Sequence, residues 1–278
     1  MQPKGLTFIL LAACLGLTGC GGGGGQSGPS TPVTPVVITP VVVVKPPVVV
    51  PPPIVTPPVL PPPVPPTPIL SLAALNRSGP IVIMPLGDSI TYGLTDPSGD
   101  GYRKPLWDDL AKAGFTLAYC GSVNNGSADL PDTRNEGHPG YYINSIAAGV
   151  DGWLKDTQPA VILLIAGTND VMQNQDLPNA PSRLSALIEQ IRRDDPTAQV
   201  LVASLPPIAL SADLEAKVEA YNAQIPGLVA AKAARGEPVV FVDVRAALTT
   251  ADLWDGEHPN PGGYAKIGDA WFQALQGL

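Results

Sequence analysis

The sequence predicts an α/β fold in which a mostly parallel sheet lies between two layers of helices. Two observations carry this prediction. Five short apolar runs alternate with five longer amphipathic segments, and the apolar runs are continuous rather than interrupted by polar residues. Strands covered on both faces have this continuous apolar character, and repeated strand–helix alternation is typical of a parallel sheet. We therefore expect a three-layer α/β/α sandwich with a central five-stranded sheet.

The expected strands all lie in residues 71–278, which we take to be one domain. A run such as "AVILLIAG" is apolar throughout and ends in glycine, so it reads as a buried strand rather than a helix. The five runs are residues 81–87, 116–122, 160–167, 199–206 and 238–244.

The expected helices lie between and after these strands. In "APSRLSALIEQIRRDDP" the residues Leu184, Leu187, Ile188 and Ile191 recur at helical spacing, and Pro196 follows them. This spacing puts one apolar stripe on a helix, and proline ends it. The five segments are residues 102–113, 143–156, 180–194, 211–235 and 262–276.

The chain begins with a targeting segment, which we place at residues 1–19. Lys4 precedes an apolar stretch too short to span a bilayer comfortably, and the stretch ends in "LTGC". This ending resembles the lipobox of bacterial lipoproteins, a resemblance that implies lipidation of Cys20. The alternative is an ordinary signal peptide with a chance cysteine. Either way we expect a protein of the bacterial cell envelope, lipid-anchored (in the outer membrane) or secreted, and not a cytoplasmic one.

Residues 20–70 read as a tether. A glycine run is followed by a segment made almost wholly of proline, valine and threonine, with Lys45 as its one charge. Such a composition cannot build a packed core and favours extended chain. We expect the domain to work at a distance from the membrane, which it would contact only through the anchor.

The charge and the numbers of cysteines and histidines limit which partners, disulfides and metal ions are expected. The net charge is −8 and no run of lysine or arginine occurs, which argues against nucleic acid as a partner. Processing would remove Cys14 and acylate Cys20, so Cys120 is left without a disulfide partner and is expected to be a buried thiol. Two histidines leave little to bind zinc, and we expect no cofactor, although a structural calcium stays open. We expect a monomer.

Polar motifs follow the strands where a ligand site is expected. Parallel sheets bind ligands at the carboxyl ends of their strands. Here Ser89 follows the first strand, "GTND" follows the third, and Asp255 and His258 precede the last helix. A serine hydroxyl becomes a nucleophile when a histidine, oriented by a carboxylate, takes its proton. His258 has Asp255 three residues before it; His138, beside Glu136, is the alternative and reads as structural.

Together these motifs resemble the four blocks of the SGNH/GDSL hydrolase superfamily, whose members share a flavodoxin-like α/β/α fold. The resemblance implies that Ser89 is the nucleophile and that its backbone N–H contributes to the oxyanion hole. It also implies that Gly140 donates its backbone N–H, Asn169 its side-chain amide, and that His258 is the base oriented by Asp255. The matching blocks are "GDSITYG" (87–93), Gly140, "GTND" (167–170) and "DGEH" (255–258).

The physical chemistry of these residues fits the implied roles. Ester hydrolysis builds negative charge on the carbonyl oxygen, which converging donors stabilise. Glycine permits close backbone approach, although Gly137 competes with Gly140 for this role, and Asn169 could instead cap a turn. Four further residues adjoin the motifs and are candidates for substrate contact, with loop support or packing as their alternatives: Asp88, Tyr92, Tyr141 and Trp254.

The segments between the blocks resemble the acetylxylan esterases of carbohydrate esterase family three. This resemblance implies removal of acetyl groups from xylan or a related plant polysaccharide. The alternatives are an arylesterase, thioesterase or lysophospholipase of the same fold, or a non-catalytic surface binding domain. The segments are "DDLAKAGFTLAYCGSVNNG", "NEGHPGYYINSI", "GTNDVMQN" and "APSRLSALIEQI".

Overall fold

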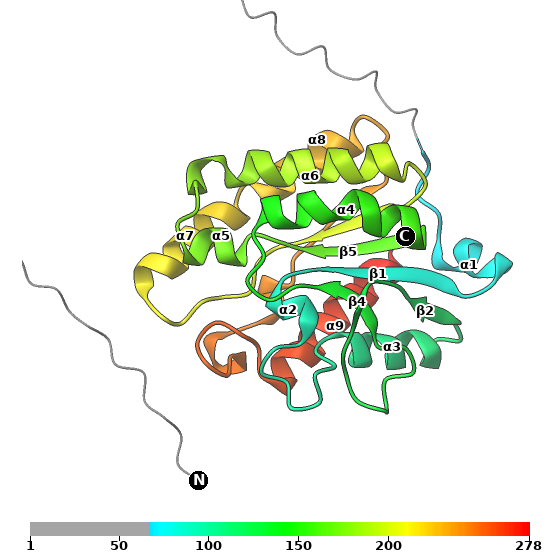
Figure 1. Ribbon diagram of the computed structural model, residues 1–278, viewed down its shortest axis with the longest axis horizontal. Coiled ribbons are helices and arrows are strands. Elements are labelled where there is room, and N and C mark those ends of the chain that lie inside the picture. Colours follow the sequence, from blue (N-terminus) through cyan, green and yellow to red (C-terminus); the bar gives the residue numbers. More distant parts are fainter. Residues whose placement is uncertain (1–66) are drawn as a thin grey trace, which may run out of the picture. The chain divides into compact units, whose positions relative to one another are not determined.

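The computed structural model of the chain describes residues 67–278, in which a sheet lies between layers of helices (Figure 1). The sheet of this described part has seven strands, and neighbouring strands are parallel except β3 and β4. The strands are β1 (Ile81–Gly87), β2 (Leu117–Tyr119), β3 (Val123–Asn124), β4 (Arg134–Gly137), β5 (Val161–Ile165), β6 (Gln199–Ala203) and β7 (Val239–Val242). Their order is β3-β4-β1-β5-β6-β7, with β2 paired to the start of β1.

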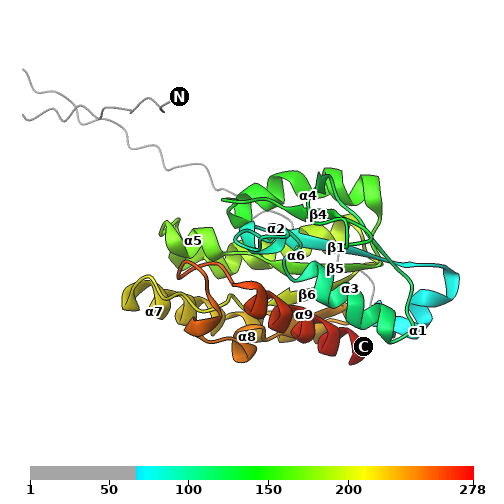
Figure 2. The same cartoon turned by 90° about the horizontal axis from the view of Figure 1, so that it is seen from below.

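Helices cover both faces of the sheet. Helices α4 and α6 pack together on one face, and α3 and α9 pack together on the other (Figures 1 and 2). The helices are α1 (Leu72–Leu75), α2 (Ser89–Tyr92), α3 (Arg103–Lys112), α4 (Ile143–Thr157), α5 (Thr168–Met172), α6 (Ala180–Asp194), α7 (Ala212–Asn222), α8 (Ile225–Ala233) and α9 (Pro261–Gln276). The three-layer α/β/α prediction is therefore confirmed.

The five predicted strands are all present, as β1, β2, β5, β6 and β7, but the sheet also contains β3 and β4. The sequence of β4, "RNEG", is polar, so it lacks the apolar run by which a strand is predicted. Its buried Asn135 and Glu136 are instead satisfied by hydrogen bonds, which makes a buried polar strand stable.

The segment 211–235 was predicted as one helix, and this is wrong. It forms α7 and α8, and Pro226 lies in the first turn of α8. Proline has no backbone N–H and its ring collides with the carbonyl four residues back, so a helix cannot run through this position undisturbed. The other four helical segments correspond to α3, α4, α6 and α9.

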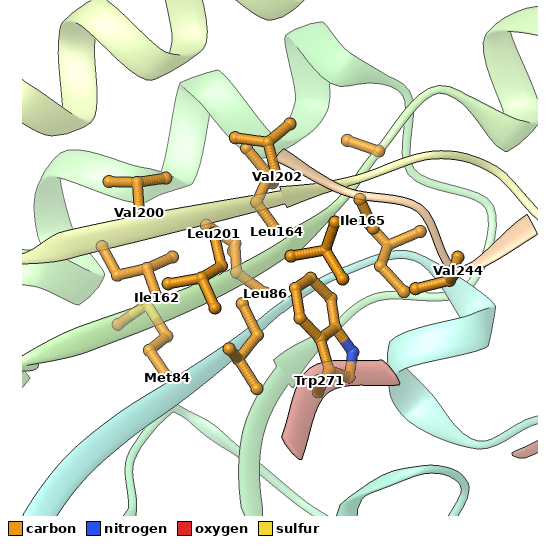
Figure 3. Close-up of a cluster of buried hydrophobic side chains, with 14 of the residues drawn as sticks. Met84, Leu86, Ile162, Leu164, Ile165, Val200, Leu201, Val202, Val244 and Trp271 are labelled. Carbon is orange, nitrogen blue, oxygen red and sulfur yellow. The ribbon is translucent and has the colours of Figure 1, made fainter. Parts of the chain in front are cut away.

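The core lies around the central strands, where β5 and β6 are buried along their whole length. Figure 3 shows Trp271 of α9 among Leu86, Ile165 and Val244, and all four side chains are fully buried. Burying one such side chain contributes about 1.5–3 kcal/mol to folding. Helix α9, which Trp271 anchors to the sheet, directly follows the loop that carries His258.

Cys120 is buried and free, as predicted, and burial raises the pKa of its thiol to about 11. The predicted signal peptide and most of the predicted tether fall on residues 1–66, outside the described residues. Leu70, in the last part of that tether, exchanges two backbone hydrogen bonds with the side chain of Gln199. No helix within residues 67–278 is long and apolar enough to cross a membrane.

Candidate active site

Ser89 begins helix α2 directly after β1, so the strand delivers it to the carboxyl edge of the sheet. Asp88 caps the helix: its Oδ1 accepts a hydrogen bond of 3.0 Å from the Ile90 N–H. A side chain at this position satisfies one of the backbone donors that a helix start leaves unpaired. The cap therefore stabilises the start of the helix, where Ser89 is the first residue.

His258 links the Ser89 hydroxyl to a carboxylate. Its Nε2 lies 2.8 Å from Ser89 Oγ, and its Nδ1 lies 2.8 Å from Asp255 Oδ2. With the proton on Nδ1 shared with the carboxylate, Nε2 is the acceptor of the hydroxyl hydrogen. Ser89 is 3% and His258 8% exposed, so the two groups are shielded from bulk water.

The loop that carries Asp255 and His258 is held together by hydrogen bonds to its own backbone. Asp255 Oδ1 accepts from the backbone N–H groups of Glu257 (3.0 Å) and His258 (2.8 Å). The Trp254 N–H donates to the carbonyl of His258, and Leu253 pairs with Pro259 across the loop. Base and carboxylate therefore come from one closed loop, and no long-range folding step is needed to align them.

The charges in this region respond to burial and to hydrogen bonds. Partial burial works against ionisation of Asp255, yet the hydrogen bonds from His258 and Glu257 hold its pKa below the ordinary value. The carboxyl of Asp88 behaves in the opposite way, since complete burial raises its pKa to about 6. Asp255 thus stays ionised beside the imidazole over the neutral range.

The three N–H donors predicted for the oxyanion hole are not all occupied by hydrogen bonds within the protein. Among the described residues, no acceptor is found for the backbone N–H groups of Ser89 and Gly140. Asn169 Nδ2 donates one hydrogen bond of 3.0 Å to the carbonyl of Tyr141, which leaves its second N–H available. By contrast, the N–H of Gly137 is taken by Asn135 Oδ1 at 2.8 Å, which removes Gly137 as a competing donor.

The two glycines serve different purposes. Gly137 lies so close to α2 that an added Cβ would come 2.3 Å from the Tyr92 nitrogen. Gly140 has a φ of +81° and open space around an added Cβ. Close approach was the reason expected for glycine at 140; the structure shows instead that the left-handed backbone requires it there.

The segment around Asn169 is tied to its neighbours by Asp170. This buried carboxylate accepts from the Ile143 N–H at 3.0 Å and pairs with Arg183 at 2.5 Å. It therefore joins α5 to the start of α4 and to α6, and it holds the loops rather than facing a ligand. Gly167, with a φ of +120°, lies against the Tyr221 ring, whose hydroxyl donates to the carbonyl of Ala166.

His138 has a supporting role in the structure. Its ring is stacked between Tyr141 (4.6 Å between centroids) and Trp153 (4.7 Å), and its Nε2 lies 2.8 Å from the buried Glu136 carboxylate. These contacts fix the segment that contains Gly140. The alternative pairing of His138 with Glu136 thus exists, but as a support for this segment.

The four candidates for substrate contact differ in how far they are exposed. Asp88 is fully buried and caps α2, which favours the alternative of loop support over substrate contact for this residue. Tyr92 is partly buried against β4. Tyr141 is 36% and Trp254 68% exposed, and both remain available to a ligand.

Sequence reasoning missed Arg103, which is completely buried. Its guanidinium donates to four backbone carbonyls, those of Tyr92, Gly99, Asn125 and Thr133. It thereby fastens the end of α2 to two loops. Since backbone carbonyls carry no side-chain identity, the sequence holds no signal for this arrangement.

Glu257 is a second residue near the site that the sequence did not single out. Its Oε1 lies 3.8 Å from His258 Nε2, on the nitrogen that faces Ser89. The signal was present, because Glu257 directly precedes His258 in "DGEH". Within residues 67–278 no group of three or more His, Cys, Asp or Glu side chains is placed to hold a metal ion.

Comparisons with known proteins place the chain in one family. A model of the GDSL-like lipase/acylhydrolase family matches residues 86–266. The chain is 32% identical over 229 residues to a multidomain esterase of Ruminococcus flavefaciens, covering 73% of this chain and 29% of that protein. It therefore spans less than a third of that relative's length.

The chain is also similar to solved structures of esterases. A family 3 carbohydrate esterase of Clostridium thermocellum is 35% identical with a TM-score of 0.65, and the match covers 71% of this chain and 98% of that one. A mutant acetyl esterase solved with an acetate ion is 27% identical with a TM-score of 0.62, over 70% and 96% of the two chains.

Proposed function

Because the chain belongs to the GDSL-like lipase/acylhydrolase family and its matched domain is a carboxylic ester hydrolase, we propose that it removes acetyl groups from carbohydrate. The proposed substrate is acetylated xylan or a related plant polysaccharide, and the proposed nucleophile is Ser89. The observation that carries the mechanism is the chain of two 2.8 Å contacts from Ser89 Oγ through His258 to Asp255.

In the proposed first half-reaction, Ser89 Oγ attacks the acetyl carbonyl carbon while its proton passes to His258 Nε2. Asp255 stabilises the resulting imidazolium and keeps the ring in the tautomer that can accept the proton. The carbonyl oxygen becomes an oxyanion, for which the N–H groups of Ser89, Gly140 and Asn169 are the proposed donors. Collapse expels the sugar alkoxide, which takes the proton back from His258.

In the second half-reaction, water attacks the acetyl group on Ser89. His258 takes a proton from that water and returns it to the departing Ser89 oxygen, which releases acetate and restores the enzyme. The same donors stabilise the second oxyanion. No further chemical group is needed for the electron and proton balance of either step.

The preference for acetyl esters of sugars is supported by the relatives and by exposed aromatic rings. One relative is a carbohydrate esterase of family 3, and another is an acetyl esterase solved with acetate. Tyr141 and Trp254 are both exposed beside the loops of Asn169 and His258. Aromatic faces of this kind pack on the apolar faces of sugar rings.

The test is acetate release from acetylated xylan by the full-length chain, beside its rates on aryl acetate, octanoate and palmitate. We expect acetate release from xylan and rates that fall as the acyl chain lengthens. A clear rise in rate with chain length would contradict the acetyl preference and favour a lipid-directed or thioester-directed enzyme. Turnover of aryl acetate without release from xylan would move the substrate to other acetylated glycans.

The proposed location is the bacterial cell envelope, with Cys20 lipidated and residues 20–70 as tether. This proposal rests on the sequence "LTGC" and the composition that follows it. We expect the full-length protein from a lipoprotein-processing bacterium to enter the detergent phase of a phase-separation assay, and the Cys20→Ala variant to stay in the aqueous phase. An aqueous wild-type protein would contradict the anchor.

A further inference from the structure

The leaving group of the proposed reaction must lie close to His258. The alcohol oxygen receives its proton from Nε2, so the two atoms come within hydrogen-bond distance when the tetrahedral intermediate collapses. The groups around Nε2 therefore form the immediate surroundings of the sugar. Among residues 67–278, the polar groups in contact with Nε2 include Ser89 Oγ, at 2.8 Å, and Glu257 Oε1, at 3.8 Å.

Glu257 differs from the other carboxylates near the site in having no hydrogen-bond donor of its own. Asp255 accepts from three groups of its loop, Asp170 from Ile143 and Arg183, and Glu136 from Ser122 and His138. In the described part of the chain, no hydrogen bond reaches the Glu257 carboxylate, and the one basic side chain within 4 Å of it is the imidazole of His258.

The Glu257 side chain is partly buried, with 19% of its surface exposed, so it has lost part of its water but can still be reached by a ligand. Burial, reinforced by the nearby charge of Asp255, raises the pKa of Glu257 above its ordinary value, and the contact with His258 offsets only part of this. A carboxylate in this state is stabilised by any hydroxyl group that donates to it.

We propose that Glu257 is a specificity-determining residue that accepts a hydrogen bond from a hydroxyl group next to the ester oxygen of the substrate. The two oxygens of a vicinal diol lie about one hydrogen-bond length apart. An ester oxygen placed at His258 Nε2 therefore brings its neighbouring hydroxyl within reach of Glu257. The site would select monoesters of vicinal diols, such as singly acetylated sugar rings, over esters of simple alcohols.

This inference rests on the proposed function, because it assumes that His258 protonates the leaving alcohol. It is tested with two acetates of the same ring. The monoacetate of trans-1,2-cyclohexanediol carries the neighbouring hydroxyl, and cyclohexyl acetate lacks it. The full-length wild type is compared at pH 8 with Glu257→Gln and Glu257→Ala, and with the control Glu219→Gln, whose side chain is 63% exposed on α7.

The measured quantity is the ratio of kcat/KM for the diol monoacetate to kcat/KM for cyclohexyl acetate. Since both values come from one protein sample, the ratio does not depend on the fraction that is folded. We expect the wild-type ratio to fall by about tenfold in Glu257→Ala, the effect of one hydrogen bond to a charged group, and substantially in Glu257→Gln. Glu219→Gln should keep the wild-type ratio.

The outcomes separate the two levels of the argument. Equal ratios in wild type and both Glu257 variants, with turnover that still depends on Ser89, would overturn the role of Glu257 and leave the proposed function intact. A fall in the ratio that also occurs in Glu219→Gln would trace the effect to net charge and overturn it as well. Turnover that persists in Ser89→Ala would overturn the proposed function and this inference with it.

Discussion

Replacing Asn169 by alanine removes one proposed oxyanion donor and tests how the site stabilises charge. Asn169 Nδ2 spends one N–H on the Tyr141 carbonyl at 3.0 Å, and the second is available to the substrate. Losing one such donor lowers kcat by about 10²–10³-fold, or about 2.7–4 kcal/mol of transition-state stabilisation. Because the charge exists only in the transition state, we expect KM to change little.

The same substitution has a smaller structural effect that can be separated from the catalytic one. Loss of the hydrogen bond to the Tyr141 carbonyl costs about 1 kcal/mol of folding free energy. For a domain of this size, a loss of that order lowers Tm by about 2–4 °C. The variant should therefore remain fully folded at 25 °C while its kcat has fallen by two or three orders of magnitude.

The assay is steady-state hydrolysis of p-nitrophenyl acetate, with thermal unfolding followed in parallel. Gln175→Ala is the matched control, since it removes an exposed side-chain amide just after α5. We expect its kcat to stay within about twofold of wild type, as for other surface substitutions away from special features. A loss of kcat below about tenfold in Asn169→Ala, or a rise in KM alone, would refute the role of Asn169 in charge stabilisation.

Further substitutions test the remaining parts of the site. Asp255→Asn should lower kcat by roughly 10³–10⁴-fold, and His258→Ala should lower it further. The reason is that the amide oxygen of the new asparagine can still accept the hydrogen bonds from the loop backbone. Equal losses of kcat in the two variants would contradict this order. Asp88→Asn should gain stability relative to wild type between pH 4 and pH 7. The folded-state pKa of Asp88 is raised from 3.8 to about 6, so the wild type loses stability as pH rises through that window, by roughly 3 kcal/mol. Urea unfolding at both pH values measures the difference, and a pH-independent difference would show that Asp88 does not carry the shift. Arg103→Lys should destabilise the domain by about 3 kcal/mol, since lysine cannot reach four separated carbonyls; an unchanged Tm would contradict that role.

The main elements of the fold could be predicted because their sequence patterns are strong. Helix α6 (Ala180–Asp194) has the predicted bounds, and its apolar stripe is buried. Strand β1 also has the predicted bounds. By contrast, β4 is buried through hydrogen bonds of polar side chains, and no apolar pattern records it. The break between α7 and α8 does have a sequence signal, because Pro226 interrupts a continuous helix.

The candidate site shows the same division. Ser89, Asp255 and His258 could be predicted because short motifs carry them, one after the first strand and one before the last helix, and the structure brings Ser89 and Asp255 each within hydrogen-bond distance of His258. Arg103 could not, because its partners are backbone carbonyls from separate loops. For Glu257 the sequence gives the residue but not the orientation of its side chain. That orientation decides whether the carboxylate faces solvent or His258 Nε2.

The most direct test of the account is covalent labelling of Ser89. A fluorophosphonate reacts with a serine hydroxyl only when a neighbouring base and an oxyanion site activate it. We expect the intact mass of the full-length chain to rise by one adduct, with the label on Ser89 in the peptide map. Labelling should be absent in Ser89→Ala and strongly slowed in His258→Ala. Labelling of Ser89→Ala at the wild-type rate, or no labelling of the wild type, would contradict the assignment of Ser89 as the nucleophile.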